Sequence, residues 1–356
     1  MPAPLHLAVG LLLARGLAWS DRLQLIARMR AWQGARWRAV DGTSAADVIG
    51  TVSATMRDRF FEPLCLGALN LRLHDAHGQI FLNVLRDSIG AARRASEFWI
   101  ARTDLSALFP DAAVAALRAA CRIELRTPVQ ALQRAATGWQ LTLRAGAAIG
   151  ARVTARAVVL AVPPDRAATL LASAHEPALD AACAQLGAIE FAPIATVYLR
   201  YAAPPALAAP VMALLESPAT RAYGQWVFDR GALDPKDAGV LAVVISGRGP
   251  HLDLPHTDLA HAVATQLSRA FKCAAPMASA VIVEKHATVL AKVGLVRPPA
   301  ILPLDGLFLA GDAADSAYPS TLEGSVRAGV AAARAVSARR SAPPPAPLAG
   351  DRPQSR

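Results

Sequence analysis

The sequence is poor in lysine and has no compact block of positive charge. Its 37 basic residues include only four lysines, at positions 236, 272, 285 and 292, and the arginines are scattered along the chain. The net charge is +10, but the sequence contains no compact basic stripe with interleaved aromatic residues, the pattern typical of nucleic-acid binding. We expect no nucleic-acid partner.

Cysteine is also scarce, and its spacing excludes two kinds of site. The four cysteines, Cys65, Cys121, Cys183 and Cys273, lie far apart and form no C-x-x-C pair. Neither a zinc site nor a redox dithiol is indicated, and we expect no metal. Isolated cysteines fit a reducing cytoplasm and are expected to be small buried apolar residues.

Apolar runs long enough to cross a bilayer are lacking. The stretch 5–14 is apolar except for His6 and ends at Arg15, well short of the about 20 residues that a membrane-spanning helix needs. It also lacks the positive start of a signal peptide. We expect a cytoplasmic protein, and peripheral contact with the inner face of the membrane is left open because the chain combines positive charge with apolar surface.

What is present suggests about two domains of mixed helix and strand, with 54% hydrophobic residues in 356. Residues 1–60 show helical periodicity. Strand-like alternation predicts strands from 123 to 129 and from 139 to 143, and the continuous apolar run 155–162 is typical of a strand buried on both faces. Further strands are predicted at 194–201, 223–228, 240–246 and 280–283, with helices at 166–171 and 256–271.

The stretch 306–336 carries the most informative pattern. A short apolar strand, 307–310, is followed by Gly311 and Asp312, at the strand end where open α/β sheets bind ligands. Ser320 and Glu323 form a capping box for a helix, so the N–H groups of Thr321, Leu322 and Glu323 would attract an anion or an electron-rich ring edge. An ordinary strand, loop and capped helix would give the same pattern, and these residues alone name no ligand.

This stretch resembles the C-terminal signature of the amine-oxidase and phytoene-desaturase flavoproteins, in which a Gly-Asp turn and a Pro-x-[ST]-[ILV]-[EH]-Gly helix start face FAD. The matching segments are 311–312 and 319–324. Other segments are similar to the hydroxysqualene dehydroxylases, the squalene-associated FAD-dependent desaturases of hopanoid synthesis. They are FEPLCLGALN (61–70), FLNVLRDS (81–88), QWVFDR (225–230) and EKHAT (284–288).

The resemblance implies an α/β fold, mixed with α+β character, in which an incomplete Rossmann-like FAD domain is interleaved with a helical and mixed-sheet substrate domain. It assigns 1–104 and 171–300 to the substrate domain, 105–170 and 301–336 to the FAD domain, and 337–356 to a disordered tail. It implies that Asp312 binds a ribityl hydroxyl and that Gly311, Ser320, Thr321, Leu322 and Glu323 form the flavin-facing turn and helix start. The backbone of Val129 would contact adenine.

The same resemblance implies an FAD-dependent oxidoreductase that removes the hydroxyl of hydroxysqualene to give squalene, an apolar isoprenoid. A reduced nicotinamide is one candidate for the electron donor. Glu62, Asp87, Asp229 and His286 lie in the family-like segments, but none is singled out as the catalytic acid. A carotenoid desaturase, an amine oxidase and an inactive fragment remain alternatives.

One departure from the family pattern concerns the cofactor. Relatives carry G-x-G-x-x-G in an early βαβ unit, where glycines let the backbone reach the FAD pyrophosphate. The 356 residues contain no such motif; Gly247 and Gly249 are followed by Pro250. We therefore expect an N-terminally truncated chain that binds FAD poorly by itself.

Overall fold

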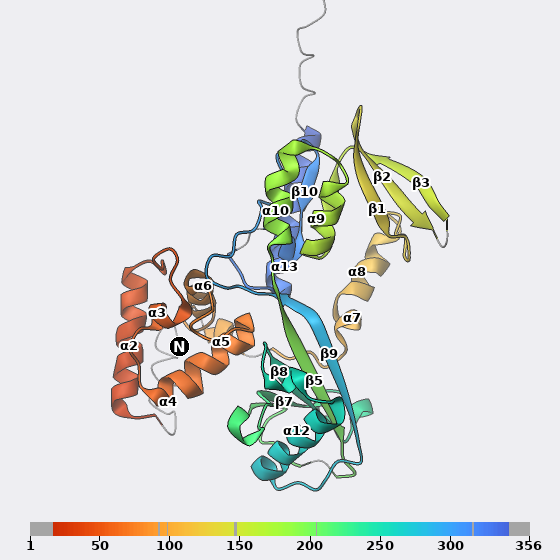
Figure 1. Ribbon diagram of the computed structural model, residues 1–356. Helices are drawn as coiled ribbons and strands as arrows, with labels where there is room; N and C mark the ends of the chain where they lie inside the picture. The colour runs from red at the N-terminus through yellow and green to blue at the C-terminus, as the bar shows by residue number, and fades with distance from the viewer. Residues whose placement is uncertain are drawn as a thin grey trace, which may run out of the picture. The chain divides into compact units, whose positions relative to one another are not determined.

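The computed structural model describes residues 17–91, 93–97, 99–145, 148–203, 205–314 and 317–341. They form two compact units, each built from separate stretches of the chain (Figure 1). The first unit comprises the described residues up to Leu125, Ala188–Val296 and the described residues up to Gly324 that follow position 316. The second comprises Arg126–Gly187, the described residues from Arg297 to 314 and those from Ser325 onward.

Short helices make up the N-terminal part of the first unit. Helix α2 buries Leu25, Met29 and Trp32, which recur at helical spacing, against a core that includes Phe61 and Phe81. A single π-helical turn, Arg57–Phe61, leads into α5. The helices are α2 (Trp19–Gly34), α3 (Ala45–Ile49), α4 (Ala54–Met56), α5 (Glu62–Leu69), α6 (Gly78–Ser88), α7 (Leu105–Leu108) and α8 (Pro110–Leu117).

A five-stranded antiparallel sheet forms the other part of the first unit, with strand order β6-β7-β8-β5-β9. Helix α12 (His256–Phe271) packs on β5 and β9 and buries Leu259, Val263 and Leu267, one residue per turn. The strands are β5 (Phe191–Arg200), β6 (Val211–Ala213), β7 (Trp226–Asp229), β8 (Val240–Ser246) and β9 (Ala278–Val289); the short helix α11 (Arg230–Leu233) follows β7.

The second unit contains two small sheets. Strands β1 (Val129–Ala135), β2 (Gly138–Ala145) and β3 (Ala148–Ala155) form an antiparallel meander. Strands β4 (Val158–Leu160) and β10 (Leu307–Leu309) pair in parallel. Helices α9 (Pro164–Ala172) and α10 (Asp180–Gly187) pack on each other, and α13 (Leu322–Ser341) ends the described chain. The predicted mixed α/β fold is confirmed.

Several predicted elements differ from the structure. Residues 123–126 are not a strand: Leu125 is 79% exposed and Arg126 adopts a left-handed turn conformation (φ 55°), so the alternating pattern has no sheet to join. The run 155–162 gives only the three-residue strand β4, in which Val159 is 40% exposed, so the strand is not buried on both faces. Strand β9 is longer than the predicted 280–283 because it pairs with β5 along most of its length.

The ends and the cysteines need further corrections. Residues 337–341 of the predicted tail are the last turn of α13, and the rest of that tail lies outside the described residues, as does the apolar stretch 5–14. Only Cys65 is buried, and burial raises the pKa of its thiol. Cys121 is exposed. No helix in the described part of the chain is both long and apolar enough to span a membrane.

Candidate functional site

The two parallel strands of the second unit end at one sheet edge. Leu309 of β10 is in register with Leu160 of β4, and the Ala310 N–H donates to the Leu160 carbonyl (2.9 Å). Because the strands are parallel, the chain leaves both at their carboxyl ends, where open α/β sheets bind ligands. Gly311 and Asp312 therefore begin the turn at this edge, as the sequence predicts.

Gly311 lies in a left-handed conformation with open space beside it. Its φ is +75°, and no atom of the described residues lies within 4 Å of the position that a Cβ would take. Asp312 follows in a single 3₁₀ turn, and its Oδ1 accepts a hydrogen bond from the Ser325 hydroxyl (3.3 Å). That bond ties the carboxylate to the first turn of α13. A ligand group can thus approach the Gly311 backbone beside the Asp312 carboxylate.

The start of α13 differs by one residue from the prediction. The helix begins at Leu322, and the Thr321 hydroxyl accepts from the Gly324 N–H (3.2 Å). Thr321 is therefore the N-cap. A Cβ on Gly324 would lie 3.0 Å from the Pro319 carbonyl oxygen, which explains the glycine that follows Glu323 in the motif.

Small residues line the inward face of α13. Gly324, Ala328 and Ala332, spaced by four residues, are buried, whereas Ala331 of the predicted small face is exposed. The apolar Leu322 is 71% exposed at the helix start. The N-terminal turn of the helix therefore has an open apolar surface next to backbone N–H groups, which is the chemistry suited to an anion joined to a flat ring.

Val129 opens strand β1, and its carbonyl accepts from the Arg166 guanidinium (2.6 Å). Helix α9, which carries Arg166, contacts both β1 and the 3₁₀ turn at Gly311–Ala313. Val129 and the Gly311–Asp312 turn thus lie in one unit, and the elements that carry them contact the same helix. The proposed adenine contact of Val129 stays a prediction.

Within the first unit, α6 holds the segment that precedes the α13 start. The Tyr318 hydroxyl donates to Asp87 Oδ2 (2.5 Å), and the buried Asn83 amide donates to the Ala317 carbonyl (2.9 Å). Arg86 forms two hydrogen bonds with the Asp87 carboxylate, and this pairing raises the pKa of Arg86. Sequence reasoning named Asp87 but missed Tyr318 and Asn83, since their polar side chains gave no spacing signal.

The other family-like segments meet around α5. The backbone of Asn70 is in a left-handed conformation, and its side-chain amide donates to Thr288 Oγ1 (2.8 Å). A Cβ on Gly67 would lie 3.6 Å from the Trp226 indole nitrogen. Residues more than 150 positions apart in the sequence are thus in contact. The structure brings FEPLCLGALN, QWVFDR and EKHAT together in the first unit, and α5 also packs on α6, which carries FLNVLRDS.

The remaining acid candidates have structural partners. Glu62 accepts from Arg72 (3.3 Å) and from the Leu73 N–H, and Arg72 also pairs with Glu216 (2.7 Å). Burial lowers the pKa of Arg72, but the two carboxylates outweigh it and raise that pKa overall. Asp229 caps helix α11. Among the described residues, Asp87 is the acid candidate with a contact to the segment that precedes α13, through Tyr318.

His286 stacks on Phe191, with ring centroids 4.7 Å apart and the ring planes 10° from parallel. Both residues lie on the paired strands β9 and β5. The contact is the sort that two rings make across neighbouring strands of a sheet. It gives His286 a packing role on the surface of the sheet.

Comparison with known proteins agrees with this geometry. Residues 43–337 match the family described as flavin containing amine oxidoreductase. A hydroxysqualene dehydroxylase from Rhodopseudomonas palustris is 30% identical over 288 residues, which cover 79% of this chain and 62% of that protein. One from Sinorhizobium fredii is 27% identical over 85% of this chain and 69% of its own length. The chain thus spans less than two thirds of the first relative.

Solved structures show the same fold. An oxidoreductase from Methanosarcina mazei superposes with a TM-score of 0.66 at 16% identity, over 89% of this chain and 73% of that one. The cyclohexylamine oxidase from Brevibacterium oxydans gives 0.59 at 15% identity, over 92% of this chain and 77% of its own. The chain belongs to the flavin containing amine oxidoreductase family, and the family implies a flavin cofactor.

The residues present fit a flavin. In the second unit, open space beside Gly311 permits close backbone approach, and the Asp312 carboxylate can accept a hydrogen bond from a hydroxyl. In the first unit, the helix start at Leu322 has backbone N–H groups and an exposed apolar residue, which suit a charged group or a ring edge. Each of these contacts is local to its own stretch of chain.

Proposed function

We propose that this chain forms part of a flavin-dependent oxidoreductase that removes the hydroxyl of hydroxysqualene and yields squalene. The observation that carries the proposal is the gathering of the family-like segments around α5, through Asn70–Thr288 and Gly67–Trp226. The two hydroxysqualene dehydroxylases support the same assignment, because their similarity covers most of the chain.

The chain's own residues would hold FAD in named ways. Asp312 would accept a hydrogen bond from a ribityl hydroxyl, and the Leu322 and Glu323 N–H groups would face the pyrophosphate or the ring edge. The backbone of Val129 would contact adenine. A reduced flavin, once bound, supplies a hydride equivalent. We propose a reduced nicotinamide as the source of those electrons.

The reaction then needs three things from the protein. The allylic C–O bond breaks, the hydroxyl takes a proton and leaves as water, and the carbon gains a hydride. The protein must hold a long apolar substrate, exclude bulk water and deliver the proton. Asp87 already accepts from Arg86 and Tyr318, so we assign it the role of positioning the segment at Tyr318 before α13. We also propose that the protein acts in the cytoplasm at the inner face of the membrane, because an apolar substrate partitions into the bilayer.

The test uses the protein isolated from its own cells, incubated anaerobically with hydroxysqualene and reduced FAD, with products read by gas chromatography and mass spectrometry. Squalene is expected, and the Asp312→Ala variant should lose both flavin and squalene formation. Asp305→Ala is the matched control, because Asp305 precedes the other end of β10 and pairs with Arg339. Turnover of phytoene or of an amine in place of hydroxysqualene would refute the substrate assignment.

A further inference from the structure

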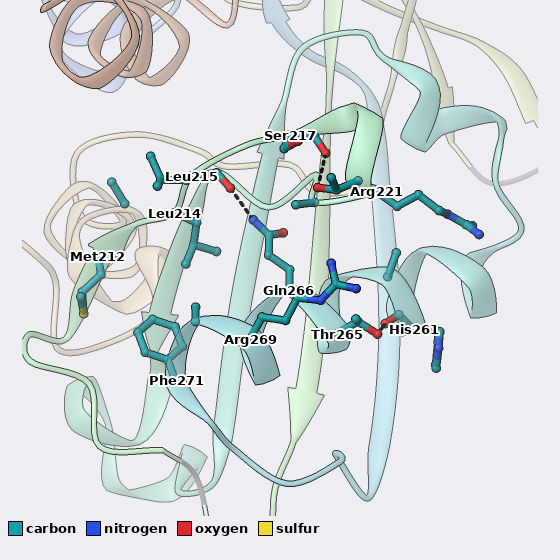
Figure 2. A pocket seen from close by; sticks show the side chains of 15 residues that line it. Met212, Leu214, Leu215, Ser217, Arg221, His261, Thr265, Gln266, Arg269 and Phe271 are labelled. Carbon is teal, nitrogen blue, oxygen red and sulfur yellow. Dashed lines mark hydrogen bonds between the residues drawn. The ribbon is translucent and has the colours of Figure 1, made fainter. Parts of the chain in front are cut away.

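The first unit contains a pocket that none of the proposed flavin residues lines. It has a volume of about 640 Å³ and lies between strand β6, the turn that follows it and helix α12 (Figure 2). A volume between about 300 and 1,000 Å³ is typical of small-molecule sites. The walls come from two stretches, 212–222 and 261–271, both in the described chain.

Gln266 fixes the two walls relative to each other. Its side-chain nitrogen donates to the carbonyls of Leu215 (3.0 Å) and Gly224 (2.9 Å), and its oxygen accepts from the Gly224 N–H (2.7 Å). Gln266 is only 7% exposed, so these bonds are shielded from water. Because every polar atom of this amide has a partner, the residue forms a clamp that preshapes the pocket.

The lining of the pocket combines apolar walls with uncompensated positive charge. Met212, Leu214 and Phe271 supply apolar surface, while Arg221, Arg269 and His261 are exposed. None of the lining residues is acidic, and in the described part of the chain no ion pair or side-chain hydrogen bond occupies either arginine. Figure 2 shows Arg269 among the lining side chains, with Arg221 and His261 extending to one side.

The backbone of Arg221 belongs to a hydrogen-bonded turn. It lies in a left-handed conformation (φ 58°) at the end of a turn in which the Ala222 and Arg221 N–H groups donate to Ser217 and Pro218. Arg221 is thus the left-handed C-cap of the short 3₁₀ turn Pro218–Thr220. Arg221 therefore comes from the turn on the strand side of the pocket, and Arg269 comes from α12.

We propose that this pocket binds a single-chain anionic amphiphile, an alkyl or isoprenoid chain that ends in a phosphate or carboxylate. The chain would lie against Met212, Leu214 and Phe271, and the guanidinium groups of Arg221 and Arg269 would pair with the head group, since arginine matches oxyanions with paired donors. The site goes beyond the proposed function, because hydroxysqualene is a neutral alcohol and would form no ion pair with the two arginines.

The test titrates the purified protein with octyl phosphate by isothermal calorimetry, with 1-octanol as the uncharged analogue. Octyl phosphate is expected to saturate one site per chain and octanol to give no saturable heat. Arg269→Gln and Arg221→Gln are each expected to weaken binding by about tenfold or more, as for loss of a hydrogen bond to a charged group. Arg200→Gln is the matched control, because Arg200 is exposed at the end of β5 and does not line the pocket.

Further arms separate the sources of the ligand. Ala213→Trp places a large side chain at an exposed lining position and should block binding without disturbing the core. Equal affinity of the wild type and the Arg269→Gln variant would overturn the proposal. Binding to phosphatidylglycerol vesicles without binding of octyl phosphate would overturn it too, since it would show surface charge alone. Binding of both, each lost in Arg269→Gln and Ala213→Trp, supports a site that also takes a membrane lipid.

Discussion

Two glycines at opposite ends of strand β10 share one backbone conformation but have different surroundings. Gly306, just before the strand, has φ +77°, and a Cβ there would lie 2.5 Å from the Arg156 carbonyl oxygen. Gly311, just after it, has φ +75° with no described atom within 4 Å. Alanine at either site carries the same strain of a left-handed conformation, so the pair isolates the effect of the contact.

The magnitudes follow from those surroundings. Left-handed strain costs about 1–2 kcal/mol, and the reduced freedom of the unfolded chain offsets about 0.4–1 kcal/mol of it. Gly311→Ala should therefore lose roughly 0–1.5 kcal/mol of unfolding free energy. Gly306→Ala should lose a further ~1–3 kcal/mol from overpacking, because its Cβ would meet backbone that cannot move aside. The Val158 N–H donates to the Gly306 carbonyl (2.8 Å), which also holds this backbone in place.

Urea unfolding of the purified protein measures both free energies. We expect Gly306→Ala to be less stable than Gly311→Ala by at least about 1 kcal/mol, with similar m-values. For FAD affinity we expect the larger loss in Gly311→Ala, because the open space at Gly311 is where the cofactor would approach. Equal stabilities, or a larger flavin loss in Gly306→Ala while that variant remains folded, would refute the reasoning.

Three further outcomes are expected. Burial lowers the pKa of the His251 imidazole, so protonation of this group opposes folding. The free energy of unfolding should be independent of His251 above about pH 6.5 and should fall as the pH drops below that value. Urea unfolding at a series of pH values should show a smaller fall in His251→Phe. Tyr318→Phe removes the hydrogen bond to the partly exposed Asp87; it should cost no more than about 1–2 kcal/mol while weakening FAD binding, and unchanged flavin affinity would argue against the positioning role. The 356-residue polypeptide expressed alone should purify with far less than one flavin per chain, because its sequence contains no G-x-G-x-x-G; a yellow protein with stoichiometric flavin would show this to be wrong.

Elements with strong local signals could be predicted from the sequence. Helix 256–271 and strand 240–246 have the predicted bounds, because regular periodicity coincides with burial against a neighbouring element. The stretch 123–126 has the same kind of alternation but remains outside any sheet, since a left-handed turn follows at Arg126. Periodicity reports which face could be buried, not whether a partner strand is present.

The candidate site shows the same limit. The Gly311–Asp312 turn could be predicted, because a glycine and a carboxylate at a strand end have a recognisable chemistry. The link between Asp87 and Tyr318 could not, because it joins residues 231 positions apart. The helix starts at Leu322 with Thr321 bonded to the Gly324 N–H, a detail that the sequence could not give because adjacent hydroxyl residues are equally good caps.

The most direct measurement is the FAD dissociation constant of the protein purified from its own cells, with Asp312→Ala or Asp305→Ala introduced into the chromosomal gene. Loss of a hydrogen bond to a charged acceptor should weaken binding by about 1.5–3 kcal/mol in Asp312→Ala, roughly 10- to 150-fold, and Asp305→Ala should stay within about threefold of the wild type. Equal effects of the two substitutions, or no FAD binding by the wild type, would contradict the assignment of the flavin site.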